Sequence, residues 1–193
     1  MSLAEIAEYY YDTGNLDHHL ERLMNLRAVL DRNIQMLQVR SAKQGDLTVH
    51  QVRLPRQVCF CYRYLCEDTA DAANKLRDTY IAAARTGMMS MNARMFTMRM
   101  DSACESLDLM CCIPVNDGFT GAERKAFVET PALCIYYRDP YEGIGTAIAA
   151  LDAYVRKNHV ETTGQYRSIY LEGPPSRGAN SNDYITEVVV PIR

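Results

Sequence analysis

Two apolar stretches near the end of the sequence contain the residues whose types could form a binding site. The first reads YRSIYLEG, and because alternate side chains of a strand share a face, it groups Tyr166, Ser168 and Tyr170. Tyrosine rings offer flat apolar surfaces with a hydroxyl at one edge, which suit aromatic ligands and cations. The second stretch, YITEVVVP, contains Glu187, and a carboxylate inside an apolar strand is costly unless a charge or hydrogen bonds compensate it.

Glu187 has three interpretations from the sequence alone. It is an exposed edge residue, a structural partner of Arg167 or Arg193, or the negatively charged floor of a ligand cleft. Ion pairs that serve only stability perturb carboxylates as often as binding sites do, so the structural and the cleft interpretations both stay open.

The composition of the 193-residue chain limits its functions. Apolar residues make up 48%, enough for a sizeable core, and the net charge of −3 argues against this chain alone binding a nucleic-acid duplex. The sequence has no run of eighteen apolar residues and no signal-peptide pattern, which predicts a cytoplasmic protein without a membrane span. The seven cysteines lack C-x-x-C spacing, and the adjacent His18 and His19 point to different sides of a helix, so no metal or other cofactor is expected.

The sequence after residue 48 repeats itself at an offset of 76 or 77 residues. VRLPRQVCFCYRY resembles VETPALCIYYRDP, with Pro55 matching Pro131. LDLMCCIPV resembles YITEVVVPI, with Pro114 matching Pro191. Because the offset is nearly constant along the chain, the pattern indicates an internal duplication.

The duplication predicts the fold class. The pseudo-repeats are 49–116 and 125–193, and each is expected to run strand, helix, strand, strand, with the helices at 69–85 and 141–158. Two such units can join into one antiparallel sheet with both helices on the same face, which is an α+β architecture.

The same architecture predicts which side chains face the helices. Ile169 and Leu171 suit the helix-covered face of the sheet. This assignment leaves Tyr166, Ser168 and Tyr170 on a face open to a ligand, a partner or solvent.

Residues 1–45 are predicted to be helical and to form a dimer. Apolar residues recur with heptad spacing, at Leu16, Leu20, Leu23, Leu30, Ile34 and Leu37. About three heptads with polar flanks favour a homodimeric coiled coil, although Arg27 interrupts the seam. A single amphipathic helix packed on its own domain is the alternative. The remaining domain is expected to span 46–193.

Several of these stretches resemble bacterial regulators. YYRDPYEGIGTAIAALDAYVRKN, GQYRSIYLEGPP and DYITEVVVPI resemble the GyrI-like, or AraC-type, effector-binding domain. SLAEIAEYY and the leucine heptads resemble the end of the DNA-binding domain and the dimerisation helix of MerR-family regulators. The resemblance covers nearly the whole chain and implies a ligand-sensing, homodimeric transcriptional regulator of the bacterial cytoplasm. DNA binding would require an N-terminal head, of which this sequence contains the last helix.

The resemblance also implies which residues line the ligand cleft. At the positions matching Ser168 and Met110 the family usually carries glutamate, whose carboxylate often meets cationic ligands. Both positions are neutral here, whereas Glu187 retains its match. The expected ligand-binding residues are Glu187, Tyr170, Ser168, Tyr166 and Met110. The ligand is expected to be a drug-like small molecule, either an aromatic cation or a neutral compound.

Two other functions are compatible with the resemblance. Some GyrI-like domains resemble small hydrolases that open electrophilic compounds, and Glu187 would then act as a general base with help from Tyr170. Alternatively, the open face of the sheet binds and inhibits a partner protein. Because the glutamate usual at Ser168 is absent, we expect binding rather than catalysis and assign no catalytic residue.

Overall fold

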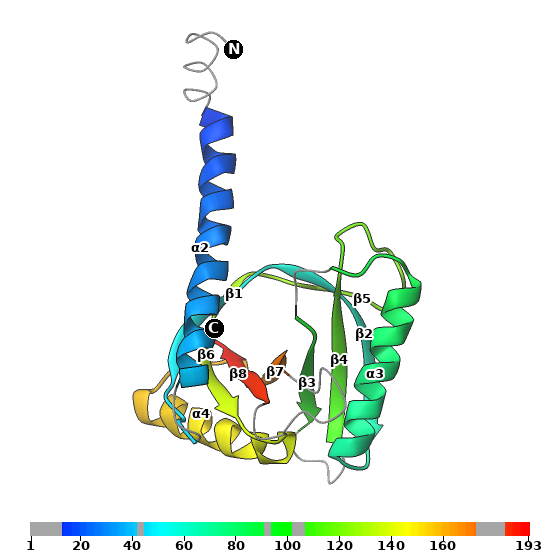
Figure 1. Ribbon diagram of the computed structural model, residues 1–193, viewed down its shortest axis with the longest axis vertical. Coiled ribbons are helices and arrows are strands. Elements are labelled where there is room, and N and C mark those ends of the chain that lie inside the picture. Colours follow the sequence, from blue (N-terminus) through cyan, green and yellow to red (C-terminus); the bar gives the residue numbers. More distant parts are fainter. Residues whose placement is uncertain (1–12, 42–44, 91–93, 102–106, 173–183) are drawn as a thin grey trace. The chain divides into compact units, whose positions relative to one another are not determined.

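The computed structural model describes residues 13–41, 45–90, 94–101, 107–172 and 184–193. The chain divides into two compact units, Met1–Ala42 and Lys43–Arg193. In the first unit, helix α2 spans Thr13–Ser41 (Figure 1). The predicted helix at SLAEIAEYY lies outside the described residues.

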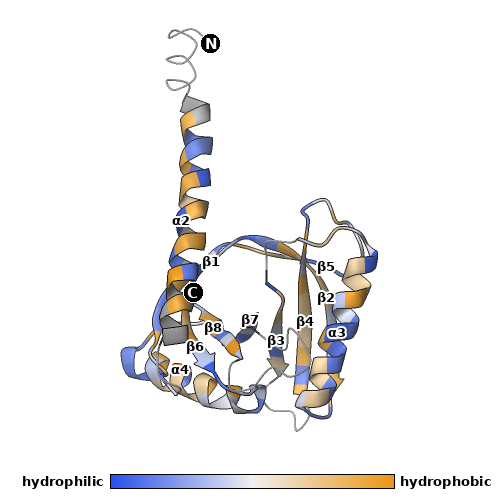
Figure 2. Ribbon diagram, viewed as in Figure 1, coloured by the Kyte–Doolittle hydropathy of each residue, from blue (hydrophilic) through white to orange (hydrophobic). Residues whose placement is uncertain are grey.

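The apolar seam of α2 is exposed along its length. The exposed fractions of the six seam residues range from 44% at Leu16 to 62% at Leu23. Leu26 and Val29 lie outside the seam and are exposed as well. Figure 2 shows hydrophobic residues recurring among hydrophilic ones along this helix. Such a surface is typical of a helix that pairs with another chain, and the homodimeric coiled coil stays a prediction.

The second unit is one eight-stranded antiparallel sheet with two α-helices, which confirms the predicted α+β class. The strands are β1 (His50–Leu54), β2 (Gln57–Cys66), β3 (Phe96–Asp101), β4 (Leu107–Val115), β5 (Arg124–Phe127), β6 (Thr130–Arg138), β7 (Arg167–Glu172) and β8 (Ile185–Pro191). The helices are α3 (Thr69–Arg85), the 3₁₀ turn η1 (Tyr141–Gly143) and α4 (Ile144–Asn158). The strand order is β1-β6-β8-β7-β3-β4-β2-β5.

This strand order is symmetric about the central pair β7 and β3. The first repeat supplies β2, α3, β3 and β4, and the second supplies β6, α4, β7 and β8. The helices predicted at 69–85 and 141–158 agree with α3 and with η1 followed by α4. The edge strands exchange between the repeats, because β1 pairs with β6 and β5 pairs with β2.

The two α-helices pack on the same face of the sheet, each over its own repeat (Figure 1). The core under α3 consists of Val58, Phe60, Ala83, Ile113, Val115 and Phe119. The core under α4 consists of Leu133, Ile135, Tyr137, Ala147, Leu151, Val188 and Val190. The two cores are separate, and the central strands β3 and β7 lie between them in the strand order.

The opposite face of the sheet is closed by the sheet's own curvature. β7 and β5 are four positions apart in the strand order, which would separate them by about 19 Å in a flat sheet. Yet the Arg167 guanidinium lies 4.7 Å from the ring centre of Phe127, and the Phe127 and Phe96 rings are 5.4 Å apart. Figure 1 shows the sheet curving, with α3 and α4 outside the curve. The prediction of an open face opposite the helices is therefore wrong.

Candidate functional site

Cross-strand pairing determines the face on which each candidate side chain lies. Ser168 is paired with Val188 on one side and with Thr97 on the other. Val188 packs under α4, and directly opposed residues of neighbouring strands share a face, so Ser168 lies on the helix-covered face. Tyr166 and Tyr170, two residues away on either side, lie on that face as well.

This placement contradicts the prediction that Ile169 packs under the helices. Ile169 is paired with Phe96 and Glu187 on the opposite face, where it is 7% exposed. The curved sheet buries both of its faces, so the apolar character of a strand residue does not identify the face that the helices cover.

A cavity of about 280 Å³ lies on the helix-covered face, between α3 and α4. Its floor contains Thr97 and Arg99 of β3, Leu107 and Leu109 of β4, and Ser168 and Tyr170 of β7. Its walls contain Ala72 and Ala73 of α3, Tyr141 and Glu142 of η1, Ile144 and Ile148 of α4, and Tyr166. This cleft therefore brings together three of the five predicted ligand-binding residues, and it lies where the two repeats meet.

Two of the cleft tyrosines are tied to neighbours by their hydroxyls. The hydroxyls of Tyr170 and Thr97 share a hydrogen bond of 3.0 Å, and burial raises the pKa of Tyr170 to about 12. The Tyr166 hydroxyl donates a hydrogen bond to Asp152. Burial, and then this bond, raise the pKa of Tyr166 well above its usual value. Both phenols are therefore neutral at pH 7, and the Asp152 carboxylate is already engaged.

Tyr141 adds a third ring to the cleft. Its ring centre lies 5.3 Å from that of Tyr170 and 5.0 Å from that of Tyr184, and burial raises its pKa to about 12. Gly143 packs so closely against the Tyr137 hydroxyl that a Cβ there would collide with it. The glycine thus allows η1 to lie against the sheet and to place Tyr141 next to Tyr170.

Arg99 is the site residue that sequence reasoning missed. The Arg99 amide donates to the Tyr166 carbonyl at 3.2 Å, and the Tyr170 amide donates to the Met95 carbonyl at 3.2 Å. These bonds are equivalent about the symmetry axis of the sheet, so Arg99 in the first repeat occupies the place of Tyr170 in the second. Aligning the central strands FTMRMD and RSIYLE would have provided the signal.

Glu187 and Met110, the other two predicted ligand-binding residues, lie outside the cleft. Glu187 is 0% exposed on the closed face, where the Tyr136 hydroxyl donates a hydrogen bond of 3.5 Å to its Oε1. Met110 is paired with Met98 on the same face, and its Sδ lies 3.7 Å from the Lys125 Nζ.

The structure does not bring together Glu187 and Tyr170, the pair on which the alternative hydrolytic function would depend. Tyr170 is paired with Thr186, whereas Glu187 is paired with Ile169, so Tyr170 and Glu187 are on opposite faces of the sheet. A general base and the hydroxyl that assists it must reach the same water molecule, which a sheet between them prevents.

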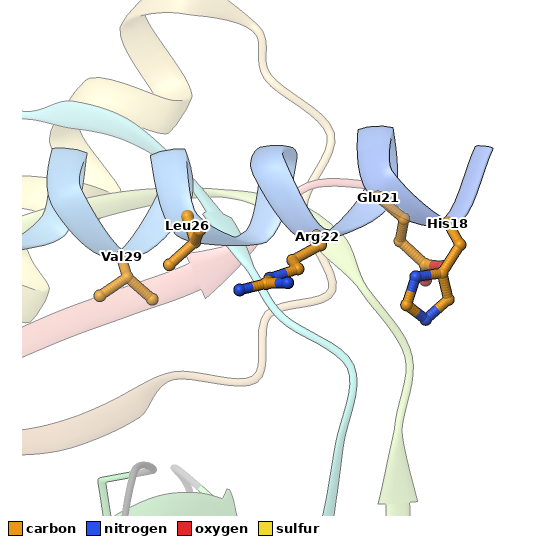
Figure 3. Close-up of a pocket in the computed structure, with 5 residues that line it drawn as sticks. All are labelled: His18, Glu21, Arg22, Leu26 and Val29. Atoms are coloured by element: carbon orange, nitrogen blue, oxygen red, sulfur yellow. The ribbon is translucent and has the colours of Figure 1, made fainter. Parts of the chain in front are cut away.

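A second hollow lies along α2. Its lining residues are His18, Glu21, Arg22, Leu26 and Val29, which come from this one helix. Figure 3 shows the five side chains projecting from the same side of α2. The other four lie 3, 4, 8 and 11 residues after His18, which places them on one helix face. One face of a single helix does not enclose a ligand, so this hollow is part of the exposed surface of α2.

Sequence comparison identifies no relative of this chain. No family model matches the sequence, and no curated protein matches it.

Among the described residues, no helix is both long and apolar enough to cross a membrane. In the same part of the chain, no group of histidine, cysteine and acidic side chains is arranged to hold a metal ion.

The fold is similar to that of several solved structures. The C-terminal domain of EcmrR, a MerR-family regulator, has a TM-score of 0.65 at 19% identity, covering 76% of this chain and 97% of that chain. EcmrR in its complex with DNA has a TM-score of 0.68 at 18% identity, covering 100% of this chain and 78% of that chain. A hydrolase from Listeria innocua has a TM-score of 0.53 at 11% identity, covering 82% of this chain and 98% of that chain. At these identities the similarity shows a common fold.

Proposed function

We propose that this chain is the effector-binding and dimerisation region of a MerR-like transcriptional regulator, and that a small molecule binds in the cleft between α3 and α4. The cleft is the observation that carries this proposal, because it combines three aromatic rings, hydroxyls and the charged side chains of Arg99 and Glu142 with apolar walls. Apolar walls with a few polar groups are typical of ligand sites. The fold that the chain has in common with the EcmrR C-terminal domain supports the same function.

The cleft is placed where a ligand would affect both repeats. Its walls come from α3 of the first repeat and α4 of the second. The central strands β3 and β7 are joined by three cross-strand pairs, compared with nine between β2 and β4. A ligand that binds one angle between the repeats more tightly than another would shift their population.

Dimerisation would carry this shift to a second copy of the chain through α2. We expect Leu23→Asp to convert a dimer to a monomer in sedimentation, because it places a carboxylate in the exposed apolar seam. Asn33→Asp, at an exposed polar position of the same helix, should leave the dimer intact. A wild-type chain that sediments as a monomer would contradict the coiled coil. DNA contact would be made through an N-terminal head.

Filling the cleft tests the proposed function. Ala72→Trp places a large ring in the cleft wall, whereas Ala84→Trp adds the same ring at an exposed position of α3. Melting temperatures would be measured with aromatic acids, neutral aromatics and aromatic cations. At one hundred times its Kd, a ligand should raise the melting temperature by about 5 to 10 °C.

We expect at least one ligand class to stabilise the wild type and Ala84→Trp but not Ala72→Trp. If no class stabilises the wild type, or if Ala72→Trp responds as the wild type does, the cleft is not the effector site.

A further inference from the structure

The charges that line the cleft do not favour a cationic ligand. Among the described residues, the charged ones that line the cleft are Arg99, on the floor, and Glu142, in η1. Arg99 is half-buried, and within the described part of the chain its buried Nε makes no hydrogen bond. A buried donor without an acceptor is unfavourable, so a ligand that supplies an acceptor would be stabilised at this position.

Neither Glu142 nor Asp152, two carboxylates among the described residues, neutralises Arg99. Glu142 is exposed, so water and salt screen its charge, and no ion pair between the described residues joins it to Arg99. Asp152 accepts the hydrogen bond from the Tyr166 hydroxyl. Among the described residues, Arg99 on the floor of the cleft therefore has no carboxylate partner.

The hydroxyl groups of Thr97 and Ser168 lie on the floor of the cleft together with Arg99. Ser168 is paired with Thr97, and Arg99 lies two residues farther along the same face of β3, about 7 Å away. This spacing is within reach of a long arginine side chain. Hydroxyls of Ser168 and Thr97 can donate hydrogen bonds to an anion, whereas a carboxylate at Ser168 would repel one.

We infer that the effector is a small aromatic carboxylate, whose carboxylate binds Arg99 and the Ser168 hydroxyl and whose ring packs against Tyr141, Tyr170 and Ile148. This inference rests on the proposed function of the cleft. The planar guanidinium of arginine matches a carboxylate with two parallel hydrogen bonds. The cavity of about 280 Å³ is slightly smaller than the range of about 300–1,000 Å³ for drug-sized ligands, so it suits an acid of one or two rings.

Titration calorimetry with three ligands of one shape tests the charge preference. The probes are 2-naphthoate, the neutral 2-naphthamide and the cationic 2-naphthylmethylammonium. The proteins are the wild type, Arg99→Gln, Arg99→Lys, Ala72→Trp and the control Arg77→Gln, which removes an exposed arginine of α3. Thermal unfolding of each variant separates a loss of binding from a loss of folding.

We expect 2-naphthoate to bind the wild type more tightly than the other two probes. Arg99→Gln should weaken the binding of 2-naphthoate roughly tenfold to a hundredfold, because a charged hydrogen bond is lost. It should leave the affinity for the neutral 2-naphthamide nearly unchanged. Arg99→Lys, which keeps the charge, should restore part of the affinity for 2-naphthoate. Arg77→Gln should bind 2-naphthoate with the wild-type affinity.

Two results would overturn the inference in distinguishable ways. If the cation or the amide binds more tightly, or if Arg99→Gln leaves 2-naphthoate unaffected, and Ala72→Trp still abolishes binding, the charge preference is wrong while the cleft remains the effector site. If none of the three probes binds the wild type, the inference and its basis in the cleft both fail.

Discussion

The two faces of the sheet are covered in different ways over the central strands. On one face, α3 and α4 each cover their own repeat, and the cleft remains between them above β3 and β7. On the other face, the sheet curves until Phe127 of β5 lies over Arg167 of β7. A duplicated fold thus leaves a cleft where separate covering elements meet, and closes the face that the sheet covers by itself.

Two arginines illustrate this difference between the faces. Arg99 and Arg167 lie on neighbouring central strands but on opposite faces. Arg167 is 7% exposed and lies over the rings of Phe127 and Phe96, and burial lowers its pKa. Arg99 lines the cavity instead. The first side chain serves packing, and the second is available to a ligand.

Removing the ring that closes the buried face should have the largest effect on stability. Phe127 is 7% exposed and contacts Phe96, so Phe127→Ala should lower the free energy of unfolding by about 3–5 kcal/mol. Urea denaturation measures this change. Val128→Ala, at a position that is 74% exposed, should change it by less than about 0.5 kcal/mol. Equal effects of the two substitutions would show that Phe127 does not close this face.

Exchanging each arginine for methionine should separate the faces. Arg167→Met should cost about 1–2 kcal/mol of unfolding free energy, because the cation–π contacts with two rings are lost. Arg99→Met should cost less than about 0.5 kcal/mol: both arginines have a buried Nε without an acceptor among the described residues, but no cation–π contact within the same residues involves Arg99. Binding of 2-naphthoate should show the reverse order. A stability loss at Arg99→Met as large as at Arg167→Met would contradict the comparison.

The tyrosines of the cleft should make stability depend on alkaline pH. Burial raises the pKa of Tyr170 and of Tyr141 to about 12, above the usual value of about 10. The folded state therefore retains these protons longer, and the free energy of unfolding should fall as the pH rises from 10 to 12. Tyr170→Phe should lose about 1 kcal/mol at pH 7, with the hydrogen bond to Thr97, and should show a shallower fall. A fall as steep as in the wild type would mean that Tyr170 does not contribute.

A thiol at the edge of the closed face should give the smallest effect, which is on reactivity rather than stability. Cys61 is half-buried, and its Sγ lies 3.3 Å from that of the buried Cys112. Hydrogen bonding with Cys112, and then with Cys59, lowers the pKa of Cys61. Brief treatment with iodoacetamide, followed by peptide mapping, should therefore label Cys61 before Cys59 and Cys112. Equal labelling of the three cysteines in the folded protein would contradict this order.

The sequence predicted the order of elements well because the duplication is visible in it. The paired prolines and the apolar periodicity located both helices at their observed residues. The exchange of β1 and β5 between the repeats was not predicted, since strand order depends on pairing over long distances in the chain. Pattern alone does not encode that pairing.

The sequence grouped some of the residues that line the candidate cleft. The alternation of side chains grouped Tyr166, Ser168 and Tyr170, and the structure keeps them together in the cleft. Their face was predicted wrongly because both faces are buried, which also separated them from Glu187. Arg99 was missed because the repeats were aligned by their outer strands, whereas the cleft lies over the central ones.

The most direct test of this account is to locate a ligand on one face of the sheet. Isoleucine-methyl NMR can do this, because Ile144 and Ile148 line the cleft, whereas Ile169 and Ile185 are buried away from it. During titration with 2-naphthoate, we expect the signals of Ile144 and Ile148 to shift while those of Ile169 and Ile185 stay in place. Shifts confined to Ile169 and Ile185 would place the ligand on the closed face and contradict the account.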